Sequence, residues 1–424
     1  MPRATEDKPI DPRQFGHLKK LRHILPLLEA LRDCGCERDR AQNRELHFDQ
    51  YVTLVLLYLF NPLIDSMRVL QEAAAVEKIS EQLGVGRFSL GSFSESVRVF
   101  EPKRLKAVIE RLAGELKPLQ ADPRLKQHID QVLTIVDGTV LDALVKVARA
   151  FWLNFSDGTP KHAWRLHVQF DLELGAAVDA ELTDARNSGP SDEKNVLLRK
   201  LKSDHCYVMD RGFTRFTLFN AIHKASSSYV CRVRDWIRYD IVEERLLSDG
   251  DLSAGVVRDA RVNIGTASKP ANRPDHPVRL VVVEATPHQK RGGRKGKTAG
   301  SSNPGTILIA TNLLDVPAEI IALVYHYRWT IEVFFRFFKQ TLGCRHLISQ
   351  RVEGIEVQVY CALIACMLIN LWTGKKPGKH MINMLAWYFM GIATEKEVEA
   401  FLARPDNTGV KLRQREAYFK SIGL

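Results

Sequence analysis

Two short hydrophobic stretches, each followed by an aspartate, decide the fold. Residues 132–139 read VLTIVDGT, and residues 205–213 read HCYVMDRGF. Short apolar runs of this kind are typical of buried strands, and the glycine that follows each aspartate lets the chain turn. If the two strands are neighbours in one sheet, Asp137 and Asp210 meet at one edge, where α/β sheets commonly bind ligands. Taken singly, an aspartate at the end of a strand is more often a turn or capping residue.

The residues around these stretches predict a mixed sheet with helices packed on it. Alternating hydrophobic residues at 164–171 and 176–182 indicate two further strands, and another strand follows at 229–233. Acidic residues 192 and 193 open one helix, and a second helix runs to about residue 223. The order strand-strand-strand-helix-strand-helix-strand is that of the ribonuclease H-like α/β fold. We therefore expect such a core at residues 125–235, completed by residues 316–342.

The rest of the chain is expected to form three further regions. Residues 1–124 have a helical pattern, residues 236–315 form a β-rich insertion, and residues 343–424 are again helical. Within the first region, a helix at about 67–83, a glycine-containing turn and a helix to about residue 99 have two interpretations. They fit either a helix-turn-helix that reads DNA or an ordinary helical hairpin.

The charge balance favours a polyanionic partner. The 424 residues include 61 Lys and Arg against 50 Asp and Glu, a formal net charge of +11. This excess is typical of nucleic-acid-binding proteins, although an unrelated basic enzyme would also have it. Five cations stand among glycines and serines within the insertion: Lys290, Arg291, Arg294, Lys295 and Lys297. Because this composition cannot bury a core, we expect either a mobile arm that contacts DNA or a solvated loop.

Cysteine usage and hydropathy indicate a cytoplasmic protein with no membrane partner. The seven cysteines are an odd number, and several stand in apolar runs, as reduced thiols do. Cys34 and Cys36 have no second Cys/His pair at zinc-ligand spacing nearby, so a zinc site is not expected. The first residues lack the apolar core of a signal peptide, and the most apolar stretch, 359–371, fits a buried helix better than a membrane span.

A third acid stands on a helix expected at about residues 318–342. At 100° per residue, Tyr325, Arg328, Glu332 and Lys339 share a stripe roughly 60° wide, with Arg336 beside it. The opposite face carries the side chains expected to pack: Leu323, Tyr327, Ile331, Phe334 and Phe338. A merely solvated face would have interspersed acids, whereas Glu332 is the only acid between residues 322 and 342. A single carboxylate in a basic, aromatic stripe suits metal binding beside a polyphosphate. Lys339, about 10 Å further along the axis, is better placed to hold a DNA phosphate.

These motifs resemble those of the DDE transposases of bacterial insertion sequences. The spacing Tyr325, Arg328, Glu332, Lys339 matches the signature of the insertion-sequence-four group, in which a tryptophan such as Trp329 often follows the arginine. The second-acid motif matches at residues 210–213, and the first at residues 137–139, where Gly138 departs mildly from the usual pattern. The resemblance covers about residues 133–342 and includes the β-rich insertion.

The resemblance implies a metal-dependent DNA endonuclease and strand transferase. Asp137, Asp210 and Glu332 would hold two Mg²⁺ or Mn²⁺ ions, which carboxylates bind and which assist in-line displacement at phosphorus. Binding to the terminal inverted repeats of a mobile element, cleavage at its ends and joining of the 3′-hydroxyls to target DNA would follow. The residues implied to contact DNA are Tyr325, Arg328, Lys339, Arg211, Trp329 and Arg336, although Trp329 could equally be a core residue.

The implied setting is the bacterial cytoplasm, with the protein on the nucleoid when DNA-bound. Members of this family act as a homodimer on double-stranded DNA, and the apolar residues 357–372 fit either the dimer interface or core packing. Two rival functions stay open. The protein could be a ribonuclease H-like nuclease or resolvase that cuts without joining, or a domesticated, non-catalytic DNA-binding protein.

Overall fold

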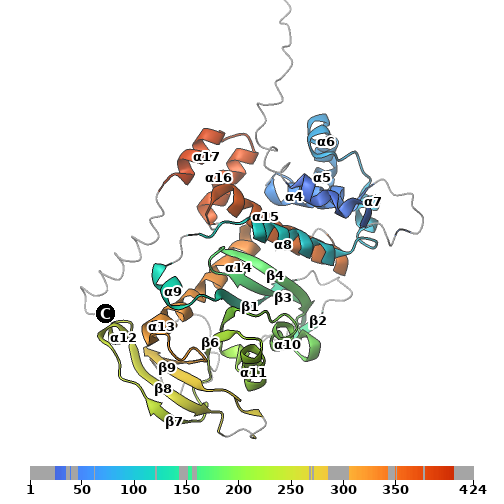
Figure 1. Cartoon of the computed structure of the whole chain (residues 1–424). Helices are drawn as coiled ribbons and strands as arrows, with labels where there is room; N and C mark the ends of the chain where they lie inside the picture. Colours follow the sequence, from blue (N-terminus) through green and yellow to red (C-terminus); the bar gives the residue numbers. More distant parts are fainter. Residues whose placement is uncertain are drawn as a thin grey trace, which may run out of the picture. The chain divides into compact units, whose positions relative to one another are not determined.

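The structure is a computed structural model, drawn in Figure 1. It describes residues 24–34, 39, 46–61, 63–119, 122–142, 151–154, 160–266, 269, 272–284, 305–341, 349, 351–375 and 378–404. The chain divides into two compact units: residues 1–34, 43–93 and 378–424 form the first, and residues 35–42 and 94–377 form the second. The basic tract at 285–304 lies outside the described residues.

The first unit is helical where it is described. Its helices are α2 (Leu25–Glu29), α3 (Leu31–Cys34), α4 (Phe48–Phe60), α5 (Met67–Ala74), α6 (Glu77–Leu83), α16 (Lys379–Phe389) and α17 (Glu395–Leu402). Helix α4 is apolar on nearly all sides and is buried from Phe48 to Leu59 apart from two polar residues near its start, as expected of a central helix. The expected helix at 67–83 is two helices, the second ended by Gly84 at φ 64°. Helix α7 (Leu90–Ser96), which follows, spans the division between the two units.

The second unit contains a ten-stranded sheet of order β2-β3-β1-β5-β6-β10-β9-β8-β7, with β4 also paired to β3. The strands are β1 (Val132–Asp142), β2 (Phe151–Asn154), β3 (Pro160–Asp171), β4 (Ala176–Asp184), β5 (His205–Met209), β6 (Ser228–Arg232), β7 (Tyr239–Glu244), β8 (Val256–Ile264), β9 (Val278–Glu284) and β10 (Thr306–Thr311). Strand β1 is antiparallel to β3 and parallel to β5, and β5 is parallel to β6. The expected ribonuclease H-like order is confirmed, with β2 as an addition.

Helices cover this sheet. They are α8 (Leu105–Glu115), α9 (Pro123–His128), α10 (Glu193–Leu198), α11 (Phe216–Lys224), α12 (Asp249–Ser253), α13 (Ala318–Tyr327), α14 (Trp329–Thr341) and α15 (Val352–Thr373), with short 3₁₀ turns η2 (Pro102–Arg104), η3 (Gly189–Ser191) and η4 (Arg211–Phe213). Leu197 of α10 and Phe219 of α11 pack with Tyr207, Tyr229 and Leu280 of the strands in one buried cluster. Helix α14 contacts β1, α13 contacts β6, and α8 and α15 contact β4.

The insertion is part of the same sheet rather than a separate layer. Strand β10 pairs antiparallel with β6, and β9, β8 and β7 follow it outward. The insertion also fixes the start of α13, because Asp251 Oδ1 accepts the Glu319 N–H at 2.8 Å. Buried Arg279 of β9 donates to the carbonyls of Leu313 and Leu314, both at 3.2 Å, and to that of Val316. The strands of the insertion therefore help to position the helices that follow.

One expected helix is two helices in the structure, and another is longer than its most apolar stretch. The single helix expected at 318–342 is interrupted at Arg328, where bonds from Arg328 N–H to Tyr325 and from Ile331 N–H to Arg328 span three residues instead of four. Helix α15 is long and apolar enough to cross a membrane by composition, yet 78% of its most apolar window is buried inside the structure. It packs on α8 and β4, so core packing accounts for its hydrophobicity.

Candidate active site

Asp137 and Asp210 flank the point at which β1 and β5 separate. The last pair of the parallel ladder joins Ile135 to Val208. Each aspartate stands two residues beyond its member of that pair, so the two carboxyl groups are brought to the same edge of the sheet. The sequence prediction of a shared edge agrees with this register. Asp137 does not end its strand, however, because β1 continues to Asp142 in pairing with β3.

Backbone N–H groups hold one oxygen of each aspartate. The Gly138 N–H donates to Asp137 Oδ1 at 2.7 Å, and the Gly212 N–H donates to Asp210 Oδ1 at 2.7 Å. A hydrogen bond to an ionised oxygen is stronger than a neutral one and fixes the orientation of the carboxylate. Each aspartate therefore presents its second oxygen in a defined direction, which a metal ligand requires.

Glu332 is joined to this edge by Arg328. The Arg328 Nη2 donates to Glu332 Oε1 at 2.6 Å, while Nη1 lies 3.8 Å from Asp137 Oδ2. The same guanidinium lies 5.9 Å from the centre of the Tyr325 ring. The structure thus brings together the first acid, the third acid and two members of the predicted helix stripe, although α13 ends before Arg328 and α14 begins after it.

Burial and like charge make Asp137 a perturbed acid. Burial raises the pKa of Asp137 to about 7, and the nearby Asp210 and Glu193 carboxylates act in the same direction. The Gly138 N–H and the Arg328 guanidinium oppose this rise by favouring the charged form. Desolvated carboxylates that repel one another are the arrangement that a bound cation would relieve.

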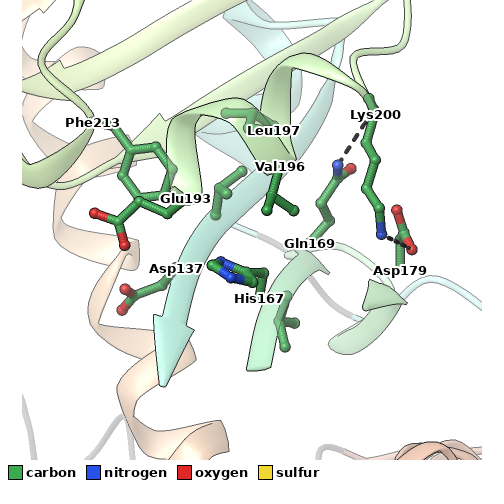
Figure 2. Close-up of a pocket in the computed structure, with 11 residues that line it drawn as sticks. Asp137, His167, Gln169, Asp179, Glu193, Val196, Leu197, Lys200 and Phe213 are labelled. Carbon is green, nitrogen blue, oxygen red and sulfur yellow. Dashed lines mark hydrogen bonds and ion pairs between the residues drawn. The ribbon is translucent and has the colours of Figure 1, made fainter. Parts of the chain in front are cut away.

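Glu193 is a residue of this site that the sequence analysis missed. The sequence pattern indicates only a first-turn helix acid at this position, and Glu193 is the first residue of α10. A methyl group added at Gly212 would lie 2.9 Å from Glu193 Oε1 and 2.9 Å from Asp210 Oδ1, so these two oxygens are at most twice that distance apart. Asp137 and Glu193 also line one small hollow beside β1, where Figure 2 shows both carboxylates turned to the same side.

The donor set suits a hard divalent cation. Mg²⁺ and Mn²⁺ prefer oxygen ligands, and the acids gathered here offer carboxylate oxygens. Among the described residues no group of three potential ligands is already assembled at metal-binding distances. Arg328 instead pairs with Glu332, so Oε1 of this acid is already engaged.

The other predicted DNA-contact residues lie on the elements that adjoin Asp210 and carry Glu332, namely η4 and α14. Arg211 is exposed beside Asp210, and Arg336 is exposed on α14. Trp329 is 45% exposed, which is not the burial of a core residue. Lys339 is half-buried in the last turn of α14. Whether any of these side chains contacts DNA stays a prediction.

Comparison with known proteins agrees with this geometry. Residues 128–368 match the family model described as the transposase DDE domain. Because the match spans more than half of the chain, the protein belongs to the DDE-domain transposase family. The predicted resemblance to DDE transposases is confirmed, whereas the insertion-sequence-four subgroup stays a prediction.

Individual relatives are distant. The putative transposase y4zB of Sinorhizobium fredii is 25% identical over 49% of this chain and 52% of its own length. The putative transposase InsL for insertion sequence element IS186A of Escherichia coli is 24% identical over 56% of this chain and 65% of its own length. A probable transposase for insertion sequence element IS5377 of Geobacillus stearothermophilus is 24% identical over 68% of each chain. The chain thus spans about half to two thirds of the length of these curated relatives.

Proposed function

We propose that this protein is a transposase that binds the terminal inverted repeats of its insertion sequence and moves the element by cut-and-paste transposition. It cleaves DNA at the element ends by metal-dependent hydrolysis and joins the freed 3′-hydroxyls to target DNA. The observation that carries the proposal is the register of β1 and β5, which sets Asp137 and Asp210 at one edge, with Glu332 linked to it through Arg328. Membership of the DDE-domain family supports the same reaction.

Asp137, Asp210 and Glu332 are the catalytic residues of this proposal. Two Mg²⁺ or Mn²⁺ ions would supply the Lewis acidity that in-line displacement at phosphorus needs. Asp137 and Asp210 would hold the ions through their second oxygens, because Gly138 and Gly212 fix the first ones. Glu332 would be the third ligand.

Cationic and aromatic side chains near the acids place the DNA. Arg328 and Tyr325 contact a phosphate close to the cut, and Arg211 and Lys339 hold neighbouring phosphates. Trp329 is exposed enough to stack on a displaced base. The active form is a homodimer bound to double-stranded element ends and target DNA, in the bacterial cytoplasm and on the nucleoid.

One experiment separates this function from its rivals. Purified protein is incubated with labelled element ends, supercoiled target DNA and Mg²⁺, and both cleaved and joined products are quantified. Joined product is expected, and Asp210→Asn should abolish cleavage while end binding in a gel-shift assay persists. Cleavage without joining would identify a nuclease or resolvase, and binding without cleavage would identify a non-catalytic DNA-binding protein. Either result would overturn the proposal.

A further inference from the structure

The two carboxylate oxygens of Glu193 face different neighbours. Arg165 of β3 approaches Oε2, with Nη1 at 3.3 Å, and both side chains are mostly buried. Oε1 lies on the other side, beside Gly212 and Asp210. The backbone N–H of Glu193 donates to Asn187 Oδ1 at 3.1 Å, which fixes where α10 begins. The helix start is therefore set by Asn187, and the carboxylate is oriented by Arg165.

An ordinary structural ion pair does not account for this placement. A pair between Arg165 and Glu193 alone would be satisfied without bringing a third charge near it. Here Glu193 Oε1 and Asp210 Oδ1 both lie 2.9 Å from the position that a methyl group at Gly212 would take, so a second carboxylate stands close to the pair. Arg165 Nε is buried and has no hydrogen-bond partner within the described part of the chain, so the pairing is incomplete on its side too. Carboxylates in such proximity repel one another unless a cation lies between them.

The acids at this edge of the sheet outnumber the guanidinium groups that contact them, so their charge is not balanced without such a cation. Four carboxylates gather here: Asp137, Asp210, Glu193 and Glu332. Two guanidinium groups lie within 4.0 Å of them, with Arg165 on Glu193 and Arg328 on Glu332 and Asp137. When all four acids are ionised, these contacts leave two negative charges, which one divalent ion would balance.

We propose that Glu193 is a fourth carboxylate of the catalytic site and holds a divalent cation together with Asp137 and Asp210. Arg165 is its positioning residue, because it pairs with Oε2 and leaves Oε1 facing Asp210. The idea rests on the proposed function, since it assigns a further ligand to the metal site of that reaction. It explains why Glu193 and Asp137 line the same hollow with their carboxylates on one side, as Figure 2 shows.

The test measures Mn²⁺ affinity of the full-length, DNA-free protein by isothermal titration calorimetry. Glu193→Gln keeps the size of the side chain and removes its charge, and the dissociation constant should rise at least tenfold. Asp192→Asn is the matched control, because it removes a charge from the neighbouring residue and asparagine also caps helices well. Its dissociation constant should stay within twofold of wild type. Asp210→Asn is the reference variant, because it removes a metal ligand of the proposed function.

A double variant controls for weaker Mn²⁺ binding that is caused only by loss of folding. Glu193→Gln leaves a buried guanidinium unpaired, so Arg165→Gln/Glu193→Gln is made as well, and thermal unfolding is recorded for each. Arg165→Gln alone should weaken Mn²⁺ binding less than Glu193→Gln, and the double variant should bind no more weakly than Glu193→Gln. Glu193→Asp, which keeps the charge with a shorter reach, should restore part of the affinity.

The outcomes separate this inference from the proposed function. Loss of Mn²⁺ affinity in both Asp210→Asn and Glu193→Gln supports the fourth carboxylate. Loss in Asp210→Asn with wild-type affinity in folded Glu193→Gln overturns the role of Glu193 and leaves the transposase proposal standing. If Asp210→Asn binds Mn²⁺ as wild type does and also cleaves DNA, the metal site itself is misassigned and both proposals fail.

Discussion

Arg328 and Glu332 stand on either side of the first turn of α14 and are joined by a hydrogen bond of 2.6 Å. The same guanidinium lies 3.8 Å from Asp137, so one cation spans the first and third acids of the site. In this arrangement Arg328 supplies positive charge beside two of the acids that we propose as metal ligands. A guanidinium is always charged and weakly hydrated, and it is equally suited to a phosphate. Arg328 and a metal ion would therefore compete for Glu332, and Glu332 and a DNA phosphate would compete for Arg328.

Arg328→Gln should have opposite effects on metal and on DNA. Without the competing guanidinium, Mn²⁺ affinity of the DNA-free protein should rise several-fold, because two carboxylates lose their internal cation. Cleavage of element ends should fall at least tenfold, because a phosphate contact close to the cut is lost. Calorimetry and a labelled-end cleavage assay measure the two quantities. Arg258→Gln, which removes a surface cation of β8 paired with Glu244, should change neither, and weaker Mn²⁺ binding in Arg328→Gln would contradict the competition.

The raised pKa of Asp137 predicts a pH dependence of stability. Its pKa is about 7 in the folded protein against the ordinary value of 3.8 for an aspartate. The unfolded chain gives up this proton between about pH 4 and 7 while the folded protein retains it, so the contribution of Asp137 to stability falls as pH rises through that window. Asp137→Asn should therefore gain stability relative to wild type from pH 4 to 7, by at most ~4 kcal/mol.

Urea unfolding of the metal-free protein at several pH values measures this difference. Asp130→Asn, an exposed substitution just before β1, serves as the control. A difference between Asp137→Asn and wild type that does not change between pH 4 and 7 would show that Asp137 ionises as readily in the folded protein as in the unfolded chain.

Gly212→Ala should damage the site without unfolding the protein. The added methyl group would lie 2.9 Å from both Asp210 Oδ1 and Glu193 Oε1, so the two carboxylates must move apart. We expect cleavage to fall at least tenfold with a stability loss of about 1 kcal/mol, typical of a single substitution. Gly138→Ala is the matched comparison, because its methyl group would meet Arg165 Nη1 and His167 Nδ1 at 3.5 Å, an ordinary contact. Cleavage assays should show a much smaller loss there, and equal losses would count against crowding as the cause.

The sequence predicted the parts of this site that depend on local pattern. The strand that ends at Met209 and the spacing from Tyr325 to Lys339 could be read from residue types alone. The extension of β1 beyond Asp137 could not be predicted from residue types, because it depends on pairing with β3. The break between α13 and α14 at Arg328 could not be predicted either, because residues 318–342 contain no proline or glycine. Glu193 was missed because a first-turn helix acid has a sufficient local explanation, whereas its approach to Asp210 depends on how α10 packs.

Lys339→Ala should weaken DNA binding and flatten its salt dependence. If Lys339 holds one phosphate, the slope of log affinity against log salt concentration should become less steep by about 0.9. Fluorescence anisotropy with a labelled element end, between about 50 and 200 mM salt, measures this slope. Lys224→Ala removes an exposed lysine at the end of α11 that pairs with Asp275. This variant should leave the slope unchanged. An unaltered slope in Lys339→Ala would remove this residue from the DNA interface.

We expect Arg279 to stabilise the fold, including the segment that leads into α13. Its guanidinium is 2% exposed, pairs with buried Asp259 through two contacts of 2.7 Å, and donates to the carbonyls that precede α13. Arg279→Met leaves Asp259 buried without its partner, which costs about 3–5 kcal/mol in comparable cases. The double variant Arg279→Met/Asp259→Leu removes both charges and should recover part of this loss in urea unfolding. If the double variant is as unstable as the single one, the hydrogen bonds to the carbonyls before α13, rather than the ion pair, are what the fold requires of Arg279.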